Sequence, residues 1–249
     1  MRLFLLGATG NSGRRILRFA LQRGYQVTAF VRNQDKLVEI LGRSLPQGLH
    51  VIVGNIEKSA ELAGATAGHD VVINAAGYVT EGERFTRLVQ GVIQQSSTSL
   101  GAGSRIWQFG GAAVLDIPGT NLKGVDLPMV PKIYEAHRTN LNTLTNSSLD
   151  WSMLCPGPMI EAPDGEPTKG LRLSVDEWPV ARPAYTQVLP NVALAFAFKQ
   201  IIPELTITYE DAADIILNNL DRNGPFSRKR VGVALPVEMR NFKANVPRG

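Results

Sequence analysis

Three glycines near the start of the chain are spaced so that the backbone around them could bind a phosphate group. Gly7, Gly10 and Gly13 stand three residues apart in the run Gly7-Ala8-Thr9-Gly10-Asn11-Ser12-Gly13. In such a turn the first glycine permits a tight exit from a strand, the second lets a pyrophosphate approach, and the third lets a helix pack against the sheet. The free N–H groups and the positive end of that helix would face the phosphates. The alternative is a tight turn without a ligand, but an apolar run before it and an amphipathic run after it favour a dinucleotide site.

The segments around this turn alternate between short apolar runs and longer amphipathic ones. The apolar runs predict strands at residues 3–6, 26–31, 49–53, 71–75, 105–109, 151–154 and 231–235. The amphipathic runs predict helices at residues 10–24, 35–41, 59–66, 83–100, 131–147 and 209–220. This alternation predicts an α/β fold of Rossmann type, a doubly wound parallel sheet with helices on both faces.

The last third of the chain is punctuated by prolines and has no clear periodicity. They are Pro156, Pro158, Pro163, Pro167, Pro179, Pro183 and Pro190. We therefore expect a single dinucleotide-binding domain over residues 1–249. Its small irregular C-terminal region, mainly within residues 156–207, would consist of loops facing the substrate. Thr208 or Asp211 could cap the helix that follows.

Composition narrows the classes of protein to which the chain can belong. The hydrophobic content of 44% and charged content of 19% are those of an ordinary globular protein. The net charge of +4 suits an anionic ligand without indicating nucleic acid. Cys155 is the only cysteine, which excludes an intramolecular disulfide, and the three scattered histidines predict no metal site. We expect a cytoplasmic location and no membrane contact, since no apolar run reaches the roughly 18 residues of a membrane span.

The glycine motif and several later segments resemble a known superfamily. GATGNSG resembles the atypical, or extended, short-chain dehydrogenases/reductases, and within them the NAD(P)H-binding NmrA-like group that includes flavin reductase/biliverdin-IXβ reductase. The resemblance continues at residues 30–33 (FVRN), 53–55 (VGN), 74–77 (NAAG), 148–151 (SLDW), 156–157 (PG) and 209–214 (YEDAAD). It implies that Asn55 and Ile56 flank the adenine, and that Ala75, Ala76 and Gly77 line the path to the nicotinamide.

The end of the second predicted strand bears on the choice of nicotinamide cofactor. An NAD-preferring site usually has an acidic residue there for the ribose hydroxyl, whereas this chain has Arg32. The planar guanidinium suits a 2′-phosphate, and Arg14 and Lys36 could add charge to the same corner. The alternative is that Arg32 is an ordinary exposed residue. We expect NADP(H) to be favoured over NAD(H).

The residues that could perform acid–base chemistry only partly match the pattern of the superfamily. Its usual Ser, Tyr and Lys are represented by Tyr134 alone, because Arg138 stands in the place of the lysine and the serine after the fifth strand is missing. His137 matches a histidine position in the flavin-reductase relatives, and it could orient substrate or donate a proton. We therefore take Tyr134, His137 and Arg138 as the catalytic candidates. For Tyr134 the alternative is a packed aromatic residue, and for His137 a structural histidine.

A planar ligand could also be held by apolar side chains. The candidates are Phe109, Met129, Pro156, Met159 and Trp178, and of these Phe109 and Pro156 are expected to contact the cofactor. Each could equally be ordinary core.

Two functions are compatible with these residues. The first is an NADPH-dependent oxidoreductase that transfers hydride to a small organic acceptor such as a quinone, a flavin or a carbonyl compound. The second is a non-enzymatic NADP(H) sensor of NmrA-like type, which the missing serine and lysine favour. An epimerase ranks last because the C-terminal region is short. A monomer and a homodimer both remain open.

Overall fold

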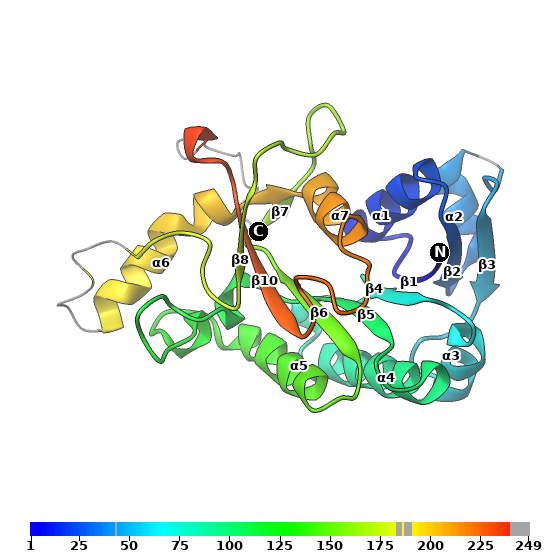
Figure 1. The fold of residues 1–249 in the computed structure, drawn as a ribbon, viewed down its shortest axis with the longest axis horizontal. Coiled ribbons are helices and arrows are strands. Elements are labelled where there is room, and N and C mark those ends of the chain that lie inside the picture. The colour runs from blue at the N-terminus through cyan, green and yellow to red at the C-terminus, as the bar shows by residue number, and fades with distance from the viewer. Residues whose placement is uncertain (43, 183–185, 187–190, 240–249) are drawn as a thin grey trace.

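A single eight-stranded sheet forms the centre of the molecule (Figure 1). The computed structural model describes residues 1–42, 44–182, 186 and 191–239. The strand order is β3-β2-β1-β4-β5-β6-β10-β8. The strands are β1 (Arg2–Leu6), β2 (Gln26–Val31), β3 (Leu49–Val53), β4 (Val71–Asn74), β5 (Arg105–Phe109), β6 (Asp150–Cys155), β8 (Arg172–Val175) and β10 (Lys229–Ala234). Every neighbouring pair is parallel except β10 and β8.

Helices cover both faces of this sheet. They are α1 (Asn11–Gln22), α2 (Gln34–Leu41), α3 (Ser59–Thr66), α4 (Glu83–Leu100), α5 (Glu135–Thr145), α6 (Asn191–Leu205) and α7 (Tyr209–Leu217). One core cluster lies under α1, α2 and α7, and a second lies under α3, α4 and α5, so each face buries its own apolar stripe. The predicted doubly wound Rossmann-type sheet is confirmed.

The region between residues 156 and 207 is more regular than its prolines suggested. It contains the antiparallel strand β8, the whole of α6, and β7 (Met159–Ile160), which pairs in parallel with β9 (Ile207–Thr208). The expectation of loops alone was therefore wrong. The sequence of α6 is apolar on most sides and contains Pro203, so it shows no amphipathic stripe from which a helix could be predicted.

The predicted helix at residues 131–147 is divided. A short 3₁₀ turn, η4 (Lys132–Tyr134), leads into α5, which starts only at Glu135. Tyr134 consequently lies at the helix entrance. At α7 both candidate caps take part, since Thr208 Oγ1 accepts from the Asp211 N–H at 3.0 Å and Asp211 Oδ2 accepts from the Thr208 N–H at 2.8 Å.

Candidate functional site

The turn between β1 and α1 requires glycine at two positions. Gly7 has a positive φ of 79°, and a Cβ added to it would lie 2.5 Å from the carbonyl oxygen of Ala75. A Cβ on Gly13 would lie 2.0 Å from the carbonyl oxygen of Gly7. Backbone atoms occupy both places, so neither contact can be relieved by rotating a side chain. The turn is thus pressed against the end of β4 on one side and against α1 on the other.

The first turn of α1 is open to an anion. Gly10 is the N-cap residue, no side chain caps the helix, and the first turn carries no acidic residue. A Cβ on Gly10 would meet only the Gly7 carbonyl oxygen, at 3.3 Å. The N–H groups of a first helical turn lack partners within the helix, so they offer a phosphate site. Thr9, Asn11 and Ser12 are at least partly exposed there, whereas Ala8 is buried and can contribute only its backbone.

Arg14 is engaged on the side of α1 that faces the segment after β7. Its Nη2 and the Nη2 of Arg15 each lie 2.7 Å from Oε1 of Glu161. Hydrogen bonding to Arg15, with Arg14 close by, holds the pKa of the Glu161 carboxyl below its usual range. Arg15 also binds the buried Glu210 at 2.8 Å. Arg14 is therefore paired with a carboxylate in this structure, and its predicted contribution of charge to the corner around Arg32 stays a prediction.

The corner expected to hold the adenosine end contains two exposed cations, Arg32 and Lys36. Arg32 directly follows β2, is exposed, and has no ion pair or hydrogen bond among the described residues. Asn33 caps α2 by accepting from the N–H groups of Asp35 at 2.8 Å and Lys36 at 3.2 Å. Asn55 accepts from the Glu57 N–H, and its own N–H donates to Glu61 at 2.8 Å. Ile56, next to it, packs against the core.

The ends of β4 and β5 are joined by two buried amide side chains. Asn74 Nδ2 donates to Gln108 Oε1 at 2.8 Å, and Asn74 Oδ1 accepts from the Ala76 N–H at 3.1 Å. Gln108 Nε2 donates to the Phe109 carbonyl at 2.9 Å. These bonds fix the backbone of Ala75 and Ala76, the predicted path to the nicotinamide. The site residues predicted from the sequence do not include Asn74 and Gln108, although a polar side chain in an otherwise apolar strand is a signal that could have indicated them.

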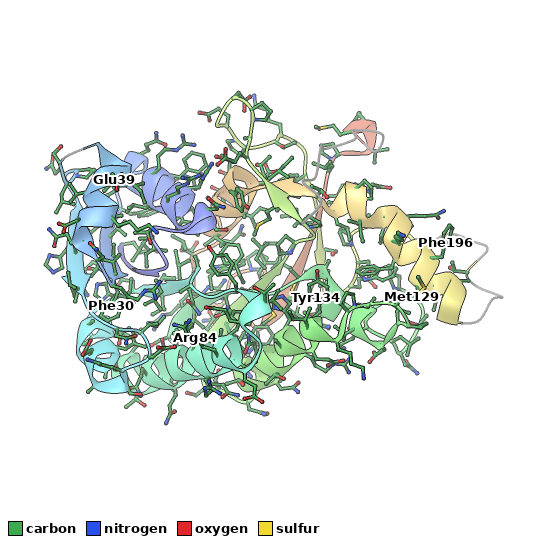
Figure 2. All side chains as sticks on the ribbon, turned by 180° about the vertical axis from the view of Figure 1, so that it is seen from behind. Phe30, Glu39, Arg84, Met129, Tyr134 and Phe196 are labelled. Atoms are coloured by element: carbon green, nitrogen blue, oxygen red, sulfur yellow. The ribbon has the colours of Figure 1, made fainter. Side chains whose placement is uncertain are left out.

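Tyr134 and His137 lie together near this edge of the sheet. Their rings are stacked, with centroids 6.3 Å apart and planes inclined by 13°. Phe85 and the imidazole of His137 form a T-shaped pair, with ring centroids 5.6 Å apart and planes inclined by 85°. The Cα of Gly77, which has a positive φ of 94°, faces Phe85 so closely that a Cβ would lie 2.7 Å from its ring. Figure 2 shows Tyr134 near the middle of this side of the molecule, with Met129 and Phe196 farther along it.

Arg138 is tied to carboxylates. Its Nη2 lies 2.5 Å from Oδ1 of Asp126 and its Nε lies 3.0 Å from Oε2 of Glu135. The charge of the Arg138 guanidinium is thus balanced by two anions in this structure. Tyr134 and His137 therefore lie together in the structure. The guanidinium of Arg138 instead pairs with Glu135 of its own helix and with Asp126.

Burial lowers the pKa of His137 to about 4, and this predicts a pH-dependent loss of stability. In the unfolded chain the imidazole of His137 takes up a proton below pH 6.5, the usual pKa of histidine. In the folded chain it does so only at about pH 4. Folding free energy is therefore lost as the pH falls through this window, by up to about 3 kcal/mol. Urea unfolding of wild type and His137→Leu at pH 7 and pH 4 should show the larger loss in wild type. Equal losses would contradict the prediction; the matched control is substitution of the exposed His50.

The five apolar candidates for a planar-ligand pocket do not gather in one place. Trp178 is core and stacks on Phe198 of α6 with centroids 5.0 Å apart, whereas Met129 is 80% exposed. Phe109 and Met159 pack against the core cluster on the α1 side. Pro156 is buried, and its carbonyl accepts from the Ala112 N–H at 2.8 Å, which joins the loops after β6 and β5. Phe109 and Pro156 thus remain at the carboxyl ends of their strands, where a cofactor contact is predicted.

The described residues contain neither a metal-binding cluster nor a membrane-spanning helix. No three His, Cys, Asp or Glu side chains there gather in a way that could hold a metal ion. No helix among them has both the length and the apolar character needed to span a bilayer.

His69 has a structural role, since its ring nitrogens lie 3.0 Å from the Thr66 carbonyl and 2.8 Å from Thr28 Oγ1.

The parallel sheet, the glycine turn and the uncapped helix start together define a Rossmann-type dinucleotide-binding protein. A family model described as NAD(P)H-binding matches residues 7–185, and the chain belongs to this family. The match confirms the resemblance to atypical short-chain dehydrogenases/reductases at the level of the cofactor-binding domain.

Individual relatives are more distant. The uncharacterized protein YwnB of Bacillus subtilis (strain 168) is 29% identical over 175 residues, which span 68% of this chain and 76% of YwnB. A proposed NADH-flavin reductase of Streptococcus pneumoniae TIGR4 superposes with a TM-score of 0.67 at 23% identity, covering 94% of this chain and 99% of that one. A short-chain dehydrogenase/reductase of Veillonella parvula DSM 2008, solved with NADP, superposes with a TM-score of 0.65 at 17% identity, covering 95% of each chain. At these identities the structural similarities show the fold.

Proposed function

We propose that this protein is an NADPH-dependent reductase of small carbonyl, quinone or flavin acceptors. The observation that carries the proposal is the stacked Tyr134–His137 pair, whose histidine contacts Gly111 in the loop after β5 and is linked through Phe85 to Gly77, at the carboxyl edge of a dinucleotide-binding sheet. The names of two structural neighbours, one a proposed NADH-flavin reductase and one a short-chain dehydrogenase/reductase solved with NADP, support a nicotinamide-dependent reductase.

The residues present suit the cofactor. The backbone of residues 7–13 would hold the pyrophosphate, Arg32 the 2′-phosphate, Asn55 and Ile56 the adenine, and Ala75, Ala76 and Gly77 the nicotinamide side. When bound, NADPH supplies a hydride. The chain orients the acceptor and excludes water, and the Tyr134 hydroxyl would deliver a proton to the acceptor oxygen. Arg138, held by Asp126 and Glu135, would support the entrance of α5 rather than touch the acceptor.

Arg32→Ala should change cofactor preference. Because Arg32 is exposed and has no ion pair among the described residues, its charge is available to a 2′-phosphate. Removing one charge-assisted contact should weaken NADPH binding about tenfold, which corresponds to about 1.4 kcal/mol. NADH binding should change little. Calorimetric titration with both cofactors measures the difference, and Lys132→Ala, a change at another exposed cation, is the control. Equal losses for NADPH and NADH would contradict a role for Arg32 in recognising the phosphate.

The reductase proposal is tested by steady-state oxidation of NADPH with menadione, FMN and benzaldehyde as acceptors. Turnover of at least one acceptor, reduced at least about tenfold by Tyr134→Phe, is the expected result. Binding of NADPH without turnover of any acceptor would overturn it.

A second candidate is a non-enzymatic NADP(H) sensor, which the engagement of Arg138 with two carboxylates favours. A sensor must distinguish the two oxidation states, because a ligand with equal affinity for both conformations shifts nothing. Affinities for NADP⁺ and NADPH that differ by at least about tenfold, together with no turnover, would support it over the reductase.

A further inference from the structure

A carboxylate group lies near the corner where the 2′-phosphate is expected. Glu57 follows β3, which pairs with β2 up to its end, where the Gly54 N–H donates to the Val31 carbonyl at 2.9 Å. Arg32 is the next residue after Val31, so the turn that carries Glu57 begins beside it. Within this turn the Glu57 N–H donates to Asn55 Oδ1 at 3.0 Å, which fixes the backbone there. The negative charge of Glu57 and the positive charge of Arg32 therefore belong to the same corner.

Arg84 binds this carboxylate from the first turn of α4. Its Nε lies 2.7 Å from Oε1 of Glu57, and its Nη1 lies 3.0 Å from Oε1 of Glu81. Oε2 of Glu81 accepts from the Tyr78 N–H at 3.1 Å, so the guanidinium is anchored to the turn that leads into α4. Hydrogen bonding to Arg84 holds the pKa of the Glu57 carboxyl below its usual range, and the charges of Arg84 and Arg32 act in the same direction. The Glu57 carboxylate is thus directed toward α4.

The pairing of Glu57 decides which charge a cofactor meets at this corner. Arg32 has no ion pair or hydrogen bond among the described residues. An unpaired Glu57 would compete for Arg32 and would repel a 2′-phosphate, since like charges at close range destabilise each other. It would also resemble the acidic residue with which an NAD-preferring site binds the ribose 2′-hydroxyl. Figure 2 shows Arg84 between Phe30 of β2 and Tyr134. The ion pair of Glu57 with Arg84 removes both unfavourable effects on a 2′-phosphate.

We propose that Arg84 is a specificity-determining residue for NADPH, because it binds Glu57 and so keeps this carboxylate from Arg32 and from the 2′-phosphate. This inference rests on the proposed function, which assigns the 2′-phosphate to Arg32. Arg84 acts through Glu57 and is therefore a positioning residue. The side chains of Arg84 and Glu57 are 48% and 42% exposed, and ion pairs as exposed as this contribute little to folding. Removing Arg84 should thus change the charge of the corner without unfolding the protein.

The first test removes the arginine and then the carboxylate that it binds. In calorimetric titrations Arg84→Ala should weaken NADPH binding about tenfold and leave NADH binding unchanged or tighter, with a smaller loss at high salt. Glu57→Gln added to Arg84→Ala should restore NADPH binding to within about threefold of wild type. The control is Arg87→Ala, which removes an arginine of the same helix that pairs with Glu83. An unchanged NADPH affinity in Arg84→Ala, equal losses for NADPH and NADH, or no recovery in the double variant would overturn the inference.

The second test isolates the 2′-phosphate and separates this inference from the reductase proposal. Arg84→Ala should bind 2′,5′-ADP more weakly relative to 5′-AMP, because these nucleotides differ only in the 2′-phosphate, whereas Arg84→Lys keeps a cation beside Glu57 and should bind both within about threefold of wild type. An equal fall for the two nucleotides would overturn the inference. Unfolding midpoints establish that the variants are folded. Every readout is of binding, so lack of turnover with all acceptors would overturn the reductase alone. Wild type that binds NADH as tightly as NADPH would overturn the inference even if an acceptor is reduced.

Discussion

Gly13→Ala is expected to abolish measurable NADPH binding. The added Cβ would lie 2.0 Å from the carbonyl oxygen of Gly7 and 3.0 Å from the Cα of Ala8. These are backbone atoms of the phosphate-binding turn, so α1 must move away from it. The movement would separate the first-turn N–H groups of α1 from the turn that places the phosphates, and binding should weaken at least about 100-fold, a loss of about 2.8 kcal/mol. Titration of NADPH followed by protein fluorescence measures it.

The matched control is Gly91→Ala. Gly91 lies in the middle of α4, and a Cβ there meets no heavy atom within 4 Å. Alanine is a better helix former than glycine by about 0.8–1.0 kcal/mol, so this variant should be as stable as wild type or more so, with unchanged NADPH binding. If Gly13→Ala bound NADPH as well as Gly91→Ala does, the turn between β1 and α1 would not be the phosphate site, and the proposed reductase would lose its cofactor-binding basis.

The sheet could be predicted from the sequence because each strand and helix in the first half carries its own local signal. The strand at residues 26–31 and the helix at residues 83–100 were predicted with the bounds that the structure shows. α6 could not be predicted, because its apolar residues surround the helix and its stability comes from packing against the core, as Phe198 does on Trp178. β8 has a similar explanation. An edge strand gains its partner, β10, only when the whole sheet has formed.

Part of the candidate site follows from local sequence and part depends on contacts between distant segments. The glycine spacing showed the phosphate turn, but only the structure shows that Gly7 faces Ala75 and that Arg14 pairs with Glu161, 147 residues away. The relation between Gly111 and His137 is of the same kind, since it joins the loop after β5 to α5 across 26 positions of sequence. Contacts between residues that are so far apart in the chain cannot be predicted from one sequence, because the register of the whole sheet determines which of them meet.

Arg105→Met is expected to lower the free energy of unfolding by about 3–5 kcal/mol, because it leaves the charge of Asp150 buried without its partner. Arg105 is the first residue of β5 and is only 1% exposed. Its Nη1 lies 3.3 Å from Oδ1 of Asp150, and its Nη2 donates to Ser152 Oγ at 2.8 Å and to the carbonyl of Asn219 at 3.1 Å. Burial lowers the pKa of Arg105, although the negative charge of Asp150 acts to raise it. The effect of desolvation on this pKa is therefore larger than the effect of the ion pair. Urea unfolding measures the loss.

Comparison variants separate the buried charge from the lost side chain. Arg87→Met removes an exposed ion pair with Glu83 on α4 and should cost no more than about 0.5 kcal/mol. Asp150→Asn added to Arg105→Met removes the unpaired charge but keeps an acceptor for the Asn223 N–H, so it should recover about 1–3 kcal/mol. If this double variant were no more stable than Arg105→Met, the loss would come from packing against Trp107 rather than from charge. Because Arg105 begins β5 at the edge of the sheet opposite Gly110 and Gly111, NADPH binding by the folded fraction should be unchanged in all three variants.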